Sequence, residues 1–182
     1  MAETKEGRGG RSKTPGPRPG GSGAASAKSE RRGGRPKARE LVLRVLYEAE
    51  ITGDDAREIL ALAFGRLRFT EEGRRYAEAL LDARLRHRRR LDAELVAQLR
   101  NWDLARLGAV ERAILRLAAA ELFHLRDTPA RVVLDEALRL AHRYGEPRSA
   151  GFVNGVLDAV SRKARPGELG EAGAGAPADG RS

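Results

Sequence analysis

Few residues of this sequence have the types and spacing that catalysis or metal binding requires. The three histidines, His87, His124 and His142, lie far apart and lack a metal-ligand spacing such as H-E-x-x-H. Asp135 and Glu136 form a carboxylate pair, but adjacent residues on a helix point about 100° apart, which does not suit shared acid–base work. The chain contains no cysteine, which excludes thiolate chemistry and cysteine zinc sites. We therefore predict no catalytic residue, no metal and no cofactor, and we expect a binding protein rather than an enzyme.

Aromatic and basic residues share one face of the first expected helix. Arg39, Leu43 and Tyr47 follow one another at i, i+4 and i+8, and Arg44 precedes Tyr47 by three residues. This combination favours single-stranded RNA, whose bases stack on aromatic rings while cations hold the phosphates. The alternative is that Tyr47 only borders the core and keeps its hydroxyl in water. A second basic run, residues 86–90, wraps around a helix, and the sequence leaves open whether it contacts RNA.

The net charge of +9 is concentrated at the start of the chain. Residues 1–38 hold ten Lys and Arg but only three Asp and Glu, whereas residues 165–182 hold two and three. The first segment is rich in Gly, Pro, Ser and Arg and has almost no large apolar residue, so burial cannot offset its ordering entropy. We expect a disordered basic tail at residues 1–34, a folded domain at 35–165 and a disordered tail at 166–182. The basic tail either attracts polyanions such as RNA or serves only solubility.

Apolar runs are too short for a membrane span. None approaches the roughly 18 residues that a span requires, and the start of the chain lacks the apolar centre of a signal peptide. We expect a cytoplasmic protein that does not contact a membrane.

Helical periodicity dominates between the two tails, and strand-like alternation is absent. The pattern predicts an all-α fold, a compact bundle of about six or seven helices joined by short connections. Asp55 and Thr70 are expected to begin the second and third helices, and the segment 70–99 forms either one long helix or two. Thr128 is expected to cap the helix that ends near Gly145, and Ser149 is expected to cap the last one.

The dipeptide Asn154-Gly155 stands inside the last expected helix, although it is a strong hairpin signal. Glycine inside a helix costs about 1 kcal/mol relative to alanine. We expect that Gly155 allows a neighbouring helix to approach closely, which would offset this cost. Asn154 is then either a buried amide that fixes the contact or a polar group facing RNA, and the first reading is preferred.

Four segments in this order resemble one family. "ARELVLRVLYEAE", "LGAVERAILRLAAAEL", "PARVVLDEALRLAHRYG" and "FVNGVLD" are similar to the bacterial transcription antitermination factor NusB. The resemblance extends from about residue 35 to about residue 163. It implies an all-helical bundle in two subdomains and an activity that is not enzymatic.

The resemblance also implies partners. Members of the family pair with NusE, a small-subunit ribosomal protein, and the heterodimer binds the boxA element of ribosomal RNA leader transcripts. The antitermination complex then helps RNA polymerase to read through terminators. Some relatives dimerise when free, so a homodimer stays open here.

Site residues follow from the same resemblance. Glu111 matches an acidic position that faces NusE, and Leu115 follows it by one turn. Without the resemblance, Glu111 is equally an ordinary acid in the first turn of a helix. The RNA-facing positions that it implies lie at the start of the first helix, at its aromatic residue and in the last helix: Arg35, Lys37, Arg39, Tyr47 and Phe152. Asn154, two residues further, is the alternative RNA contact named above.

Two other functions remain open from the sequence. A NusB-like module also begins certain ribosomal RNA cytosine methyltransferases, but those continue into a cysteine-using catalytic domain that this sequence lacks. The chain could also be a helical interaction module that binds no specific RNA.

Overall fold

The computed structural model describes residues 23–99 and 103–169, and side chains from residue 34 onward. These residues form seven α-helices, one short 3₁₀-helix and no strand, which confirms the expected all-helical bundle. None of these helices is long and apolar enough to cross a membrane. The expected tails at 1–22 and 170–182 lie outside the described residues.

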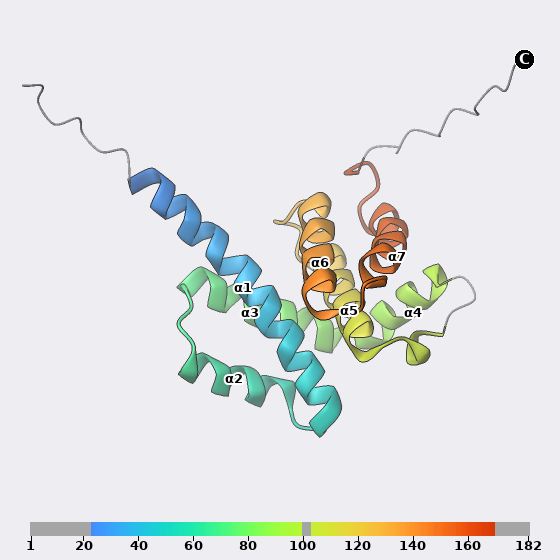
Figure 1. Ribbon diagram of the computed structural model, residues 1–182, viewed down its shortest axis with the longest axis horizontal. Helices are drawn as coiled ribbons and strands as arrows, with labels where there is room; N and C mark the ends of the chain where they lie inside the picture. The colour runs from blue at the N-terminus through green and yellow to red at the C-terminus, as the bar shows by residue number, and fades with distance from the viewer. Residues whose placement is uncertain (1–22, 100–102, 170–182) are drawn as a thin grey trace, which may run out of the picture.

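The helices form two groups around a central helix (Figure 1). α1 (Gly23–Thr52), α2 (Ala56–Arg66) and α3 (Glu71–Arg86) pack together on one side. α4 (Arg88–Gln98), α6 (Ala130–Tyr144) and α7 (Ser149–Ala164) lie on the other. α5 (Ala109–His124) follows η1 (Leu104–Arg106) and contacts both groups. From Ala113 to Leu122, all of its residues except Arg116 are buried.

The first helix starts earlier than the composition predicts. α1 begins at Gly23, so residues 23–34, which were expected in the tail, form its first turns, and Pro36 lies inside it. Alanine, lysine and glutamate are good helix formers, and their propensity outweighs the two glycines at 33 and 34. Gly53, with φ of +79°, then ends the helix in the left-handed conformation that favours glycine.

Helix caps agree with the sequence in part. Asp55 accepts a hydrogen bond from the backbone N–H of Arg57, and Thr70 accepts one from Gly73, as expected for N-caps. The segment 70–99 is two helices that meet at His87. The turn there brings Arg84 of α3 within 3.2 Å of Asp92 of α4, so an ion pair supports the break.

The predicted caps of the last two helices are wrong. Thr128 makes no cap bond, and the first N–H of α6, on Ala130, donates instead to Glu168 at 2.8 Å. Ser149 lies inside α7 and donates its hydroxyl to Glu111. At α6 a side chain distant in the sequence takes the role, which a local pattern cannot reveal. At α7, Ser149 is the first helical residue, and the N-cap residue Arg148 makes no side-chain cap bond.

Within the described residues, the fold continues beyond residue 165. Arg165 is buried and donates to the backbone carbonyls of Glu121, Leu122, Leu125 and Thr128, which satisfies the C-terminal end of α5. Because Glu168 accepts a hydrogen bond from Ala130 at the start of α6, the folded domain extends beyond the expected start of the tail at residue 166.

Candidate nucleic-acid interface

The three basic residues at the start of the predicted site point in different directions. Lys37 is exposed on α1. Arg35 is half-buried: its guanidinium donates to Glu72 at 3.1 Å and lies 5.2 Å from the centre of the Tyr76 ring. Only Lys37 is therefore fully available to a phosphate.

Arg39 is the clear correction to the predicted site. It is 3% exposed and donates from Nε to Glu121 at 2.8 Å, with Glu136 3.9 Å from its guanidinium. Desolvation alone would lower the pKa of Arg39, but the hydrogen bond and charge of Glu121 raise it. The prediction that Arg39 shares an exposed face with Tyr47 is wrong, because the groove between α1 and α5 contains a buried carboxylate that the α1 sequence does not show.

Tyr76 completes this buried cluster. Its hydroxyl donates to Glu121, and the Arg39 guanidinium lies 5.1 Å from its ring centre. Burial and the neighbouring carboxylate raise the pKa of Tyr76, so it remains a neutral donor. The cluster joins α1, α3 and α5 and has a structural role.

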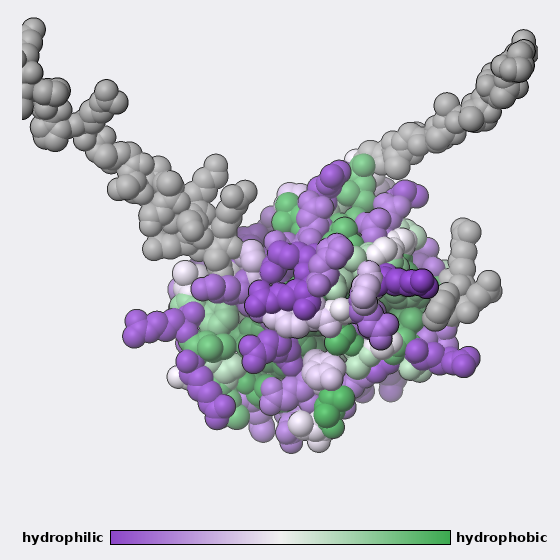
Figure 2. Space-filling model, viewed as in Figure 1, coloured by the Kyte–Doolittle hydropathy of each residue, from purple (hydrophilic) through white to green (hydrophobic). Residues whose placement is uncertain are grey.

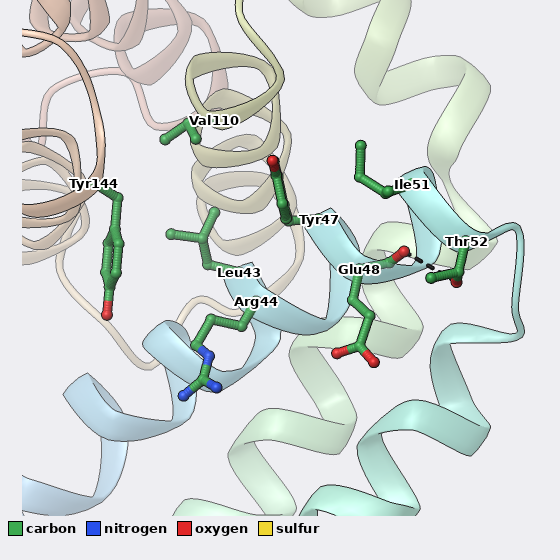
Figure 3. Close-up of a pocket in the computed structure, with 8 residues that line it drawn as sticks. All are labelled: Leu43, Arg44, Tyr47, Glu48, Ile51, Thr52, Val110 and Tyr144. Carbon is green, nitrogen blue, oxygen red and sulfur yellow. Dashed lines mark hydrogen bonds between the residues drawn. The ribbon is translucent and has the colours of Figure 1, made fainter.

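Tyr47 lies on the surface, 42% exposed, at the edge of an apolar hollow. The apolar hollow has a volume of about 400 Å³ and lies between α1, the start of α5 and the end of α6. Figure 3 shows Leu43, Tyr47 and Ile51 on the side of α1 that faces Val110, whereas Arg44 points away from it. Of the guanidinium groups expected beside Tyr47, only that of Arg44 belongs to a residue lining the same hollow, and its side chain extends from a different side of α1.

A second hollow, here called the basic hollow, lies beside the first. Its volume is about 470 Å³, and Arg44 lines both hollows. Its other basic side chains come from α1, the loop between α2 and α3, and α6: Lys37, Arg68, Arg139 and Arg143. Hydrophilic residues cover most of the face shown in Figure 2, with hydrophobic ones in separate patches between them.

Glu40 of α1 bridges to α6 where the two hollows meet. Its carboxylate accepts a hydrogen bond from the Tyr144 hydroxyl and another from Arg143 at 3.4 Å. Tyr144 lines the apolar hollow, whereas Glu40 and Arg143 line the basic one. Burial raises the pKa of Tyr144, and the hydrogen bond to Glu40 and its charge raise it further.

Glu111 occupies the first turn of α5, next to Val110 of the apolar hollow. Its carboxylate folds back over Gly108 and accepts a hydrogen bond from Ser149 of α7. Burial opposes its ionisation, but the bonds from Ser149 and from the backbone N–H groups of Glu111 and Glu146 outweigh this, so the pKa of Glu111 is lowered. Glu111 is thus an ionised group that joins α5 to the start of α7.

Leu115 cannot contact a partner in this structure. It is 0% exposed, because the side of α5 that carries it faces the core. A partner contact through Leu115, one turn beyond Glu111, therefore does not fit this fold. The apolar surface near Glu111 is the hollow beside Val110, on a different side of the helix.

Phe152 and Asn154 of α7 lie apart from both hollows, neither of which α7 lines. Phe152 is half-buried against the core, and Asn154 and Gly155 are exposed. A Cβ atom on Gly155 would meet no atom within 4 Å. The expected close helix approach at Gly155 and the buried amide at Asn154 are therefore wrong, because this turn of α7 faces outward.

Three basic residues of the basic hollow, Arg68, Arg139 and Arg143, were missed from the sequence. Arg139 and Arg143 stand at i and i+4 and so share a face of α6, which is a usable signal. Nothing local indicates that this face lies opposite Lys37 and Arg68. Among the described residues, no group of three or more His, Cys, Asp or Glu is placed to hold a metal ion.

The fold and these surfaces define an all-helical protein whose candidate site consists of adjoining basic and apolar hollows, a type of surface suited to binding a polyanion and a protein. The model of the NusB family matches residues 36–162. The transcription antitermination protein NusB of Trichlorobacter lovleyi is 39% identical over 124 residues, covering 68% of this chain and 87% of that protein. The NusB of Dehalococcoides mccartyi is 37% identical over 128 residues, covering 70% and 90%.

Solved structures agree with the sequence matches. NusB of T. maritima superposes with a TM-score of 0.66 at 31% identity, covering 71% of this chain and 91% of that one. A chain in the complex of the antitermination factors NusB and NusE with double-stranded RNA superposes with a TM-score of 0.64 at 30% identity, covering 71% and 96%. This chain belongs to the NusB family.

Proposed function

We propose that this protein is a transcription antitermination factor that binds boxA-type RNA of ribosomal RNA leader transcripts together with a NusE-like ribosomal protein. It acts in the antitermination complex of RNA polymerase and promotes read-through without catalysing a reaction. The observation that carries the proposal is the exposed Tyr47 ring on the same helix as Arg44 and Lys37. Family membership and the related complex of NusB with NusE and RNA support it.

The exposed face of α1 supplies the chemistry of RNA binding. A base or ribose packs on the Tyr47 ring, and Lys37 and Arg44 hold phosphates by charge-assisted hydrogen bonds. Arg39 contributes only by holding the helix in place. Phe152 remains a second proposed contact, supported by the family resemblance of α7, and the exposed Asn154 is proposed beside it.

The NusE-like partner is proposed to cover the apolar hollow around Ile51, with RNA contacting Tyr47 at the edge of the hollow. An exposed apolar surface bordered by polar residues is typical of protein interfaces, and Ile51 is 65% exposed at its edge. Glu111 lies next to this surface through Val110, so its negative charge is available to steer a basic partner.

Substitution of Tyr47 tests the proposal. We expect Tyr47→Ala to weaken binding of boxA RNA by about 1–3 kcal/mol without changing its salt dependence, because one stacking contact is lost and no charge. Fluorescence anisotropy of labelled boxA and scrambled RNA, with and without the NusE-like protein, measures this effect.

Ile51→Ala is the matched control, since it removes an exposed apolar side chain from the same hollow. It should weaken partner binding while leaving RNA binding by the isolated protein unchanged. Folded Tyr47→Ala protein that binds boxA RNA like the wild type would exclude α1 stacking. A wild type that does not distinguish boxA from scrambled RNA would contradict the proposed function.

A further inference from the structure

The basic hollow is rich in cations that lack acidic partners. Within the described part of the chain, Lys37, Arg44 and Arg68 form no ion pair, and all three are exposed. Arg143 forms an ion pair with Glu40, and Arg139 forms one at 2.9 Å with Glu136 of its own helix. Cations with satisfied partners are a normal protein surface, whereas unpaired ones converging on one hollow create a local positive potential that attracts a polyanion.

The size and lining of the basic hollow suit a nucleotide rather than a small ion. Its volume of about 470 Å³ is in the range of sites that hold ligands the size of a nucleotide. Leu41 and the half-buried Phe69 add apolar surface to its lining. Arginine presents a planar fork that matches phosphate oxygens, so Arg68, Arg139 and Arg143 are suited to bind a backbone from two sides.

The basic hollow continues into the surface that carries Tyr47. Arg44 lines both hollows, and Lys37 and Tyr47 are separated by ten residues of α1, which is about 15 Å along the helix axis. An extended strand that stacks one base on Tyr47 therefore reaches Arg44 and the basic hollow within a few nucleotides.

We propose that the basic hollow binds the sugar–phosphate backbone of single-stranded RNA and so extends the RNA surface from α1 across to Arg139 and Arg143 of α6. The proposal rests on the proposed function because it takes RNA as the ligand. The basic hollow would contact phosphates rather than bases. The proposal also assigns a role to Glu40. Its carboxylate opposes the incoming phosphate and occupies Arg143, so Glu40 limits the affinity of the basic hollow for RNA.

Matched charge variants test this proposal. The variant Arg68→Gln/Arg143→Gln removes two positive charges from the basic hollow, and Arg88→Gln/Arg89→Gln removes two from exposed positions on α4 that line neither hollow. Glu40→Gln removes a negative charge while keeping an oxygen that accepts the Tyr144 hydroxyl. Circular dichroism and thermal unfolding verify the fold of each. Binding of a single-stranded oligouridine of about twelve nucleotides and of boxA leader RNA is measured across a salt titration.

For Arg68→Gln/Arg143→Gln we expect roughly a tenfold loss of oligouridine affinity at low salt. The slope of log K against log salt should become shallower by about 1.4, since each lost phosphate contact on a single strand contributes about 0.7. Arg88→Gln/Arg89→Gln should change the slope by less than about 0.3, and Glu40→Gln should raise affinity about twofold or more.

The opposite results overturn the proposal. An equal loss for both arginine pairs would show a general charge effect, and an unchanged slope for Arg68→Gln/Arg143→Gln would place the phosphates elsewhere. A Glu40→Gln variant with no gain in affinity would remove the role given to this carboxylate. If the expected changes occur with oligouridine while the wild type fails to prefer boxA RNA, the basic hollow stands and the proposed function fails.

Discussion

Arg39 is a basic residue whose role is structural because it makes a buried ion pair. Its side chain is paired with Glu121 inside the protein, so truncation leaves a buried carboxylate without its counter-ion. We expect Arg39→Ala to lower the free energy of unfolding by about 3–5 kcal/mol. Arg35→Ala, which breaks a partly exposed pair with Glu72, should cost at most about 1 kcal/mol. Urea unfolding measures both, and a similar small loss for the two variants would contradict the buried role of Arg39.

Glu111 combines a charge near the apolar hollow with a bond to Ser149. Its lowered pKa means that its ionised form stabilises the fold above the ordinary value of 4.5 and that this stability is lost as the pH falls through the lowered pKa. Glu111→Gln keeps an oxygen that accepts the Ser149 hydroxyl but removes the charge. We expect it to weaken binding of the NusE-like protein, and Glu111→Lys to weaken it further, as isothermal titration would show. If Glu111→Gln binds the partner normally, the charge is not a contact and Glu111 acts only through Ser149.

At the scale of elements, the junction of α3 and α4 packs against the end of α5 through two histidines. The rings of His87 and His124 are stacked 3.9 Å apart, and Nε2 of His124 is buried with no hydrogen-bond partner in the described structure. Burial, then the charges of His87 and Arg90, lower the pKa of His124. The neutral form therefore stabilises the fold above the ordinary value of 6.5, and this stability is lost as the pH falls below it towards the lowered pKa.

We therefore expect the Tm of the wild type to fall between about pH 7.5 and about pH 5.5. His124→Phe keeps a flat ring on His87 and removes the titrating group, so its Tm should fall less over the same range. Calorimetry at matched ionic strength measures the difference. Parallel pH profiles for the two proteins would show that the stack does not control acid stability.

Across the whole molecule, part of the net positive charge lies ahead of the described residues. Residues 1–22 hold five Lys and Arg and two Asp and Glu and lack base-reading chemistry. We expect deletion of these residues to lower affinity for boxA and scrambled RNA by the same factor and to leave the thermal unfolding transition in place. Filter binding and differential scanning fluorimetry test this. Unchanged RNA affinity would show that the segment is not an arm for polyanions, and a selective loss for boxA RNA would give it a role in sequence recognition.

The proposed binding surfaces lie where the two groups of helices meet. α1 and α6 belong to different groups, and between them Glu40 meets Arg143 and Tyr144 while Arg39 lies near Glu136. Both hollows lie along this junction. Binding surfaces between packed groups of helices combine side chains that no single helix could present together.

The sequence alone determined the helical class, the helix starts at Asp55 and Thr70, and the exposed cation Lys37, because periodicity, capping and polarity are local properties. Only the tertiary structure decided that Arg39 is buried on Glu121, that Leu115 faces the core and that Gly155 faces outward. The physical reason is that helical periodicity identifies residues that share a face but does not say which neighbour, core or solvent, that face meets. A charge at the edge of an apolar stripe becomes an ion pair or a ligand contact according to what lies across the groove, and that partner comes from a distant part of the chain.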